Sequence, residues 1–504
     1  MIPADLRTRV PERVASFIDG AVVAGRGEEL PVIYPATEEQ VSAVTEAGED
    51  IVDQAVRSAR ATLDRRVWRD LPTVERQRVF ARICELTAEH LDELALLETV
   101  NTGQTLGYSR HAQLPRIIAN FRFFAEWMGQ ATERAAFEDR RMLRYTMRHP
   151  LGVVALISSS NAPTALASTK IAAALCYGNS CVVKTSENTP LALARFVELL
   201  VEAGVPAGVV NMVNGRGQVT GDALSRHPLV NGISFTGGTA TAARIAAVAA
   251  PLHKRLDLEL GGKSANIVMP SADLDLAVTA ALLAIYTNNG QQCFAGSRIL
   301  LHRDIADRFI EQFVARANRI RVGDPFAADT QNGPLAFRSH YDRVCSYIEI
   351  AHQEGARLLA GGGRPDGLEQ GLYLRPTAFL APDNSARICQ EEVFGPFASF
   401  LIVDSIEEAI SVANDSPYGL VSYVWSNDQR EVLAATHAIE AGLVMVNTPL
   451  LSLDGRMPFG GFRQSGVGRE GAEGSRAFYT EEKTVAIALE PPALPPIGLE
   501  GADR

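Results

Sequence analysis

The chain has 504 residues, of which 46% are hydrophobic and 21% are charged, and its formal net charge is −11. A chain of this length exceeds one ordinary hydrophobic core, so we expect two or three domains. The composition is typical of a soluble globular protein and excludes a disordered or membrane-embedded chain, while the acidic balance argues against a nucleic-acid partner.

Six cysteines are spread along the chain without a CxxC pair or a Cys/His cluster. This spacing indicates neither a zinc site nor a disulfide framework, so we expect no metal. The N-terminal residues do not resemble a signal peptide, and the sequence has no apolar stretch as long as a membrane span. The expected location is therefore the reducing cytoplasm, where a free thiol persists.

Residues 50–135 carry apolar positions at every third or fourth residue, which predicts long helices. The rhythm changes at residues 151–157, a continuous apolar run typical of a strand buried on both faces of a parallel sheet. Further strands are predicted at 180–184, 209–213 and 232–235, and helices at 165–176 and 190–203. This alternation predicts a doubly wound α/β sheet, whose ligands bind beyond the carboxyl ends of its strands. Residues 151–260 are the predicted nucleotide-binding region.

A second α/β set is predicted from about residue 264 to 447, with strands at 297–301 and 444–446. Two further segments, 142–148 and 484–488, alternate like strands but belong clearly to neither set. We expect these two strands to form a small flap that pairs with another subunit.

Cys293 and Glu259 are the residues of most chemical interest. The cysteine follows Gly290 and precedes Gly296, and the glutamate is followed by Gly261 and Gly262. A thiol and a carboxylate flanked by glycines suggest a cysteine nucleophile with a separate base that activates water, hence covalent catalysis on a carbonyl carbon. The alternatives are a buried structural cysteine and a satisfied structural carboxylate.

Eight sequence blocks resemble the aldehyde dehydrogenase family, in the order of that family and over nearly the whole chain. They are 161–163, 170–172, 178–184, 235–238, 259–263, 290–293, 391–396 and 458–470. The resemblance implies an α/β, aldehyde dehydrogenase-like fold with a Rossmann-type NAD-binding domain, an α/β catalytic domain and a small β oligomerisation flap. The implied domains are 1–127 with 149–258 for NAD, 259–470 for catalysis, and 128–148 with 471–504 for oligomerisation. Members of the family are usually homodimers or homotetramers.

The resemblance also implies roles for single residues. Cys293 would attack the aldehyde, Asn161 would hold the oxyanion, and Glu259 would activate water for thioester hydrolysis. Lys184 and Glu187 would hold the adenine ribose, where a glutamate repels a 2′-phosphate and favours NAD over NADP. The implied cofactor-binding residues are Ile157, Ser158, Lys184, Glu187, Gly217, Gly221, Phe235, Thr236, Gly237, Gly238, Leu260, Glu392 and Phe394.

Two regions depart from the pattern of the family. The phosphate loop usually reads Gly-Ser-x-x-x-Gly, whereas this chain has Gly237, Gly238 and, at the last position, Ala242. Backbone N–H groups at a helix N-terminus can still hold a pyrophosphate, so we expect altered contacts with the pyrophosphate but not a loss of NAD binding. In the substrate pocket, small or polar residues replace aromatic ones, at Ser160, Ala162, Thr169 and Thr287. This predicts a larger or more polar aldehyde.

Arg116 and Arg456 match positions in the branch of the family that oxidises hydroxymuconate-type semialdehydes. Arginine side chains suit a substrate carboxylate, although each could be a surface or interdomain residue. With Thr287 and Phe459 they are the predicted substrate-binding residues. Open alternatives are a general dehydrogenase for uncharged aldehydes, an acylating relative that uses coenzyme A, and a binding protein that keeps only the fold.

Overall fold

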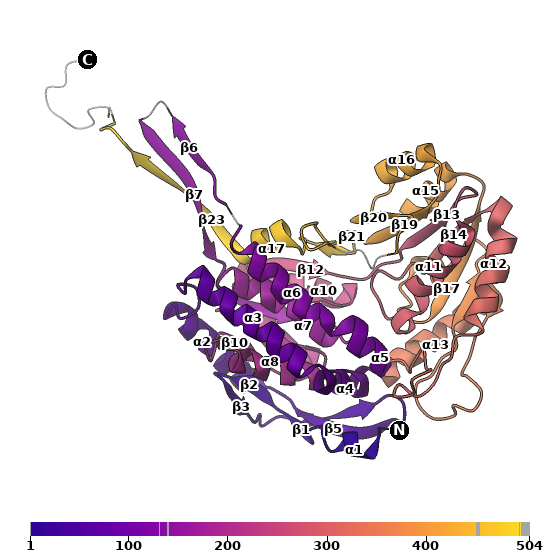
Figure 1. The fold of residues 1–504 in the computed structure, drawn as a ribbon, viewed down its shortest axis with the longest axis horizontal. Helices are drawn as coiled ribbons and strands as arrows, with labels where there is room; N and C mark the ends of the chain where they lie inside the picture. The colour runs from indigo at the N-terminus through magenta and orange to yellow at the C-terminus, as the bar shows by residue number, and fades with distance from the viewer. Residues whose placement is uncertain (1, 131, 139–140, 450–453, 493, 495–504) are drawn as a thin grey trace.

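The computed structural model describes residues 2–130, 132–138, 141–449, 454–492 and 494. Two mostly parallel sheets, each covered by helices on both faces, form the body, and a three-stranded antiparallel sheet projects from it (Figure 1). A small sheet of order β1-β5-β4 lies near the N-terminus, with β1 at Arg13–Val14, β4 at Glu29–Tyr34 and β5 at Glu39–Thr45. Within the described ranges, no helix has both the length and the apolar character that crossing a membrane requires.

The first large sheet has the strand order β22-β12-β11-β8-β9-β10-β2-β3. Its parallel centre comprises β8 (Val153–Ile157), β9 (Ser180–Lys184), β10 (Val210–Met212), β11 (Gly232–Thr236) and β12 (Arg255–Glu259). The edges are β2 (Ser16–Ile18), β3 (Ala21–Val23) and β22 (Gly466–Val467). The four strands predicted between residues 151 and 235 are confirmed, with starts within two residues of the prediction.

Successive side chains of β8 enter the cores on opposite faces of this sheet. Val154 and Leu156 pack into one core, and Val153, Ala155 and Ile157 pack into the other. This two-sided burial explains the continuous apolar run, since a strand covered on both faces has no polar side. The covering helices are α2 (Glu49–Asp64), α3 (Thr73–Glu89), α4 (Leu91–Thr102), α6 (Pro115–Trp127), α7 (Pro163–Cys176), α8 (Leu191–Glu202), α9 (Asp222–Arg226) and α10 (Thr239–Ala249).

The second large sheet has the order β15-β16-β17-β14-β13-β19-β20 and separate cores on its two faces. Its strands are β13 (Ala265–Val268), β14 (Arg298–His302), β15 (Arg357–Ala360), β16 (Thr377–Leu380), β17 (Phe397–Val403), β19 (Val421–Trp425) and β20 (Leu443–Val446). Helices α11 (Leu274–Tyr286) and α12 (Arg303–Ala317) pack on one face. Helices α13 (Arg338–Gln353), α15 (Ile406–Asn414) and α16 (Gln429–Ala438) pack on the other.

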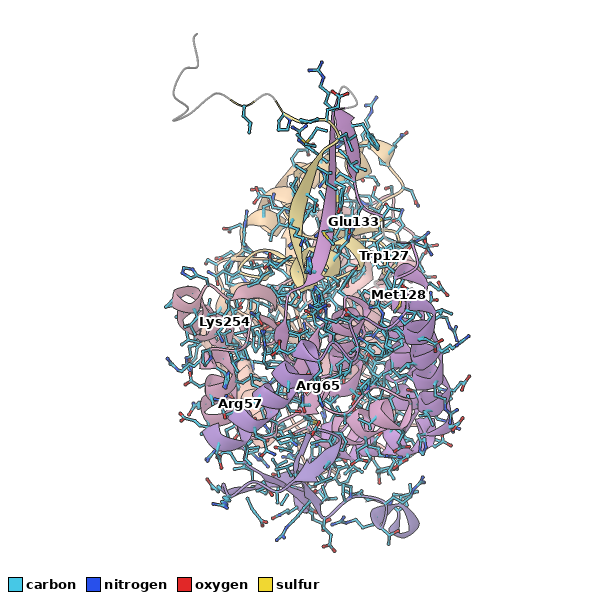
Figure 2. The ribbon with its side chains drawn as sticks, turned by 90° about the vertical axis from the view of Figure 1, so that its left-hand side faces the viewer. Arg57, Arg65, Trp127, Met128, Glu133 and Lys254 are labelled. Atoms are coloured by element: carbon cyan, nitrogen blue, oxygen red, sulfur yellow. The ribbon has the colours of Figure 1, made fainter. Side chains whose placement is uncertain are left out.

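The projecting sheet contains the two predicted strands that belonged to neither α/β set, and a third strand that was not predicted. Strand β23 (Thr480–Ala488) pairs with β7 (Met142–Pro150) over the full length of both, and β6 (Ala135–Glu138) completes the order β23-β7-β6. Glu133 lies at the base of this flap, where it pairs with Arg476 at 2.8 Å and accepts a hydrogen bond from Thr146 Oγ1 at 3.0 Å (Figure 2). The role of the flap in oligomerisation and the domain boundaries stay predictions. Residues 131, 139–140, 493 and 495–504 of the predicted oligomerisation segments lie outside the described residues.

Candidate active site

A cavity of about 2650 Å³ lies beyond the carboxyl ends of the first sheet. Four neighbouring parallel strands bring residues to its wall at the points where they end: β12 with Glu259, β11 with Thr236, β8 with Ile157 and β9 with Lys184. The loop that carries Cys293, between α11 and β14, forms part of the same wall. The cavity therefore joins the predicted nucleotide-binding region to the predicted nucleophile.

The loop before Cys293 has an unusual backbone. Asn288, Asn289 and Gly290 follow one another with φ of 52°, 55° and 66°, in the left-handed region that asparagine and glycine adopt most readily. Asn289 Nδ2 holds the loop by donating to the carbonyl oxygens of Gly333 at 2.7 Å and Pro334 at 3.0 Å. A Cβ at position 290 would lie 2.0 Å from the carbonyl oxygen of Gly395. The hydrogen bonds of Asn289 and the close approach that Gly290 allows therefore hold this loop in place.

The two glycines after Glu259 allow other parts of the site to approach the end of β12. A Cβ on Gly262 would lie 2.6 Å from the carbonyl oxygen of Cys293, and one on Gly261 would lie 2.3 Å from the carboxylate of Glu392. Glu392 accepts a hydrogen bond from the backbone N–H of Gly262 at 3.1 Å. The glycine pair therefore brings Cys293 and Glu392 close to the strand that carries Glu259.

Cys293 is half-buried and lines the cavity. Burial raises the pKa of its thiol to about 12, and the carboxylates of Glu392 and Glu259 raise it further, whereas the guanidinium of Arg116 opposes them. In the protein without bound ligands, the thiol of Cys293 is therefore protonated at neutral pH. It must lose this proton before the sulfur can react.

Glu259 is only 4% exposed, and its two carboxylate oxygens have no hydrogen-bond partner in the described part of the chain. Burial raises its pKa well above the usual value, and the carboxylates of Glu470 and Asp257 add to this effect, while Lys170 opposes it. A carboxyl group with a high proton affinity and free lone pairs on the wall of a cavity can take a proton from water.

Asn161 lies between β8 and α7, and its amide contacts the nucleophile loop. Its Nδ2 donates to the carbonyl oxygen of Gln291 at 2.8 Å, two residues before Cys293, and its Oδ1 accepts from Ser159 Oγ. Gln104 and Asn288 donate to its backbone oxygen at 2.6 and 3.0 Å. These bonds hold Asn161 against the loop that carries Cys293, and both residues line the cavity, so an amide hydrogen is available for a developing oxyanion.

The predicted cofactor-binding residues all line this cavity. They are Ile157, Ser158, Lys184, Glu187, Gly217, Gly221, Phe235, Thr236, Gly237, Gly238, Leu260, Glu392 and Phe394. The arrangement in the cavity agrees with a ligand that extends from the end of β9, past the start of α10, to Cys293.

The wall fits a dinucleotide in three respects. Ser158 Oγ is buried without a partner among the described residues, and Lys184 Nζ is buried with a single hydrogen bond, to the carbonyl oxygen of Thr185 at 2.8 Å. A Cβ on Gly217 or Gly238 would meet no atom within 4 Å, so both glycines border open space. Helix α10 begins after Gly238 without a side-chain cap, which leaves N–H groups for a phosphate.

Ala242, the departure at the end of the phosphate loop, is buried in α10 and uses its N–H on the carbonyl oxygen of Gly238 at 3.1 Å. Alanine in place of the usual glycine at position 242 therefore affects the packing of α10. It does not involve the N–H groups that remain free at the start of the helix.

The predicted substrate residues are only partly brought together. Arg116, Thr287 and Phe459 line the cavity, as do Ser160, Ala162 and Thr169. Arg116 donates to Gln113 Oε1 at 3.2 Å and has no ion-pair partner among the described residues. Arg456 is not part of the wall: its side chain is 72% exposed and forms an ion pair with Asp454. Its predicted contact with substrate has no counterpart in this conformation.

The residues that match the family model run from 22 to 485 and cover most of the chain; the model describes the aldehyde dehydrogenase family. The chain belongs to this family. It is 42% identical to a 5-carboxymethyl-2-hydroxymuconate semialdehyde dehydrogenase of Escherichia coli, over 91% of this chain and 98% of that one. It is 39% identical to a hydroxyisobutyraldehyde dehydrogenase of Mycolicibacterium austroafricanum, over 97% and 96% of the two chains.

The fold of this aldehyde dehydrogenase agrees with those of solved relatives. An NAD+ complex of an aldehyde dehydrogenase from Bacillus cereus superposes with a TM-score of 0.94 at 35% identity, over 97% of this chain and 99% of that one. The predicted fold class and the assignment as an aldehyde dehydrogenase are confirmed.

An ion pair beside Glu259 was not predicted from the sequence of this dehydrogenase. Lys170 Nζ lies 2.9 Å from Glu470 Oε1 and donates to Ser234 Oγ at 2.9 Å. Both residues stood inside matching blocks, 170–172 and 458–470, but their separation of 300 residues hid the pairing. The available signal was that each of these two blocks contains a residue of opposite charge, Lys170 in one and Glu470 in the other.

Proposed function

We propose that this NAD-dependent enzyme oxidises a carboxylate-bearing semialdehyde, of the 2-hydroxymuconate or 5-carboxymethyl-2-hydroxymuconate type, to the corresponding carboxylate through a thioester on Cys293. The observation that carries the proposal is one cavity lined by Cys293, Glu259 and Arg116. Among the described residues, the carboxylate of Glu259 has no hydrogen-bond partner and Arg116 has no ion-pair partner. The relative from Escherichia coli, named for a semialdehyde of this type, supports the choice of substrate.

In the first stage, the thiol of Cys293 loses its proton and the sulfur attacks the aldehyde carbon. The cavity is open to solvent, which takes this proton, and Glu259 acts only in the second stage. The amide of Asn161 and the backbone N–H of Cys293 donate to the oxygen that becomes negatively charged. Loss of one such donor commonly costs about 3–4 kcal/mol of transition-state stabilisation.

Bound NAD would supply the acceptor for the hydride that must leave the thiohemiacetal to give the thioester. Lys184 and Glu187 would hold the adenine ribose, Ser158 would hydrogen-bond through its hydroxyl, and Glu392 would hold the second ribose; all four line the cavity. The carboxylate of Glu187 disfavours a 2′-phosphate, so NAD is preferred over NADP.

In the second stage, Glu259 takes a proton from water, and the oxygen of that water attacks the thioester carbon. The carbon–sulfur bond breaks, the acid leaves, and the sulfur of Cys293 regains a proton. Lys170 and Glu470 form a charged pair at 2.9 Å beside Glu259, and Glu470 also lines the cavity. The pair offers the proton a path away from Glu259.

Arg116 is proposed to hold the carboxylate of the substrate. Its charge acts on the thiol of Cys293, and its guanidinium has donors to spare beyond the bond to Gln113. The side chains of Ser160, Ala162 and Thr169 on the wall are small or polar, which suits a substrate with a second polar group. Arg456 could join only after leaving Asp454.

A general dehydrogenase for uncharged aldehydes is the second candidate, since the relative from Mycolicibacterium austroafricanum is named for an uncharged aldehyde. An acylating enzyme that uses coenzyme A is less consistent with the site, because Glu259 is present on the wall of the cavity. We also propose a cytoplasmic location and a homodimer or homotetramer formed through the flap.

The test compares kcat/KM for a muconate-type semialdehyde with that for an uncharged aldehyde of similar length, in the wild type and in Arg116→Gln. We expect kcat/KM for the charged substrate to fall about 10- to 100-fold in the variant, because a hydrogen-bonded charge pair is lost. The value for the uncharged aldehyde should change little.

Two controls accompany this comparison. Arg303→Gln removes an exposed arginine that pairs with Asp404, and it should leave both values unchanged. Arg456→Gln should change them less than about threefold, as for an exposed ion pair. Equal efficiency of the wild type on charged and uncharged aldehydes would contradict the proposed substrate class.

A further inference from the structure

A buried network next to Glu259 contains a carboxyl group that the mechanism above does not use. Asp257, 2% exposed, accepts a hydrogen bond at its Oδ2 from Ser234 Oγ at 2.9 Å. Ser234 Oγ in turn accepts from Lys170 Nζ at 2.9 Å, and the same ammonium group pairs with Glu470. Asp257 and Glu470 therefore share one lysine, Asp257 through the hydroxyl of Ser234.

The strand geometry places Asp257 on the same side as the proposed base. Asp257 and Glu259 are two residues apart on β12, so their side chains leave the same face of the sheet. On the neighbouring strand β11, Ser234 stands in register with Asp257 and Thr236 with Glu259. The charge on Asp257 consequently acts directly on Glu259.

The charges in this network do not balance. Three carboxyl groups, those of Asp257, Glu259 and Glu470, surround the ammonium of Lys170. The second nearby cation is Arg469, which donates to the carbonyl oxygens of Gly461 and Gly468. Tyr479 faces Asp257 and Ser234 from α17 (Ala472–Tyr479). Asp257 Oδ1 is buried without a partner among the described residues, which leaves its negative charge only partly compensated.

We propose that Asp257 is a positioning residue for catalysis, whose charge, linked to Lys170 through Ser234, raises the proton affinity of Glu259 and so sets the pH at which the thioester is hydrolysed. The inference rests on the proposed role of Glu259 as the base. It assigns to Asp257 an action through Glu259 and no contact with substrate.

The direction of the effect follows from the charges. Burial raises the pKa of Asp257 to about 6, while the charge of Lys170 and the hydrogen bond from Ser234 favour its ionised form. Its negative charge adds to the burial and to Glu470 in raising the pKa of Glu259. Neutralising Asp257 removes this repulsion and leaves more of the charge of Lys170 for Glu259. Both changes lower the pKa of Glu259.

The experiment follows hydrolysis of the thioester without cofactor. p-Nitrophenyl acetate acetylates Cys293: the sulfur attacks the ester carbon, the carbon–oxygen bond breaks, and p-nitrophenolate leaves. Water then cleaves the carbon–sulfur bond to give acetate and the thiol. The decay of the acetyl-enzyme is measured by intact mass at a series of pH values, in the wild type, in Asp257→Asn and in Asp257→Thr.

We expect the midpoint of the acidic limb of the decay rate to fall by about half a pH unit or more in both neutral variants. Two variants of different shape separate the charge from the packing, since a merely structural role would change the decay rate without moving the midpoint. Asp404→Asn, which removes an exposed carboxylate paired with Arg303, should leave the midpoint in place.

Unchanged midpoints in Asp257→Asn and Asp257→Thr would overturn the inference while leaving the proposed function intact. Failure of the wild type to form any acetyl-Cys293 would instead overturn the proposed function, and the inference with it.

Discussion

Glu259 combines three properties that few buried carboxyl groups share: it is 4% exposed, its oxygens have no partner among the described residues, and two more carboxyl groups lie near it. Such a group destabilises the fold when it is ionised, because desolvation and repulsion both oppose the charge. The site therefore keeps a base of raised proton affinity at a cost in stability, which is common at functional sites.

This cost predicts a pH-dependent difference in stability between the wild type and Glu259→Gln. The pKa of Glu259 in the folded state is raised well above its usual value of 4.5. As the pH rises above the unfolded value, the unfolded state loses this proton before the folded state does, so the wild type loses stability up to the folded pKa. Glu259→Gln has no group that titrates at this position, so it does not lose stability in this way as the pH rises.

Thermal unfolding at a series of pH values provides the measurement. Near pH 4 the two proteins should have similar Tm values, and toward pH 8 the Tm of Glu259→Gln should exceed that of the wild type. A Tm difference that is independent of pH would show that Glu259 is not an uncompensated buried acid.

At the scale of elements, the sequence predicted most of what depends on local patterns. The apolar runs of β8, β9 and β11 and the start of α8 after Pro190 were visible because burial on both faces and a proline at a helix start leave direct marks. The placement of Cys293, Glu259, Asn161 and the cofactor residues in one cavity followed from the family resemblance, since their motifs lie far apart in the chain.

Contacts that depend on tertiary structure were not visible in the sequence. The pair Lys170–Glu470 and the bridge from Ser234 to Asp257 join α7, β11, β12 and the loop before α17, and no local pattern marks such a meeting. The exposed position of Arg456 depends on Asp454, two residues earlier, whose competing charge the sequence interpretation did not weigh. The presence of Asp454 two residues before Arg456 could have indicated this ion pair.

At the scale of the whole molecule, the flap carries an apolar row that suits a subunit interface. Phe137 on β6 and Ile487 on β23 both stand in register with Leu143 of β7, so the three side chains lie on the same face of the sheet. Phe137 is 69% exposed and Ile487 is 43% exposed. An exposed apolar row on a projecting sheet is a typical site of protein association.

We expect Phe137→Asp combined with Ile487→Asp to shift the protein toward a smaller species, measured by light scattering after size-exclusion chromatography. The charges would have to be buried without partners at the interface, which is strongly unfavourable. Leu252→Asp, a substitution of an exposed leucine on the body, is the matched control and should not change the mass. An unchanged mass in the double variant would exclude the flap as the interface.

The role of Cys293 is tested most directly by trapping the thioester. Glu259→Gln is mixed with NAD and a semialdehyde, quenched with acid, and analysed by intact and peptide mass. We predict an adduct on Cys293 with the mass of the aldehyde less two hydrogens, which accumulates because hydrolysis lacks its base and which is absent in Cys293→Ala. Full turnover by Cys293→Ala, or an adduct on any other residue, would contradict the assignment.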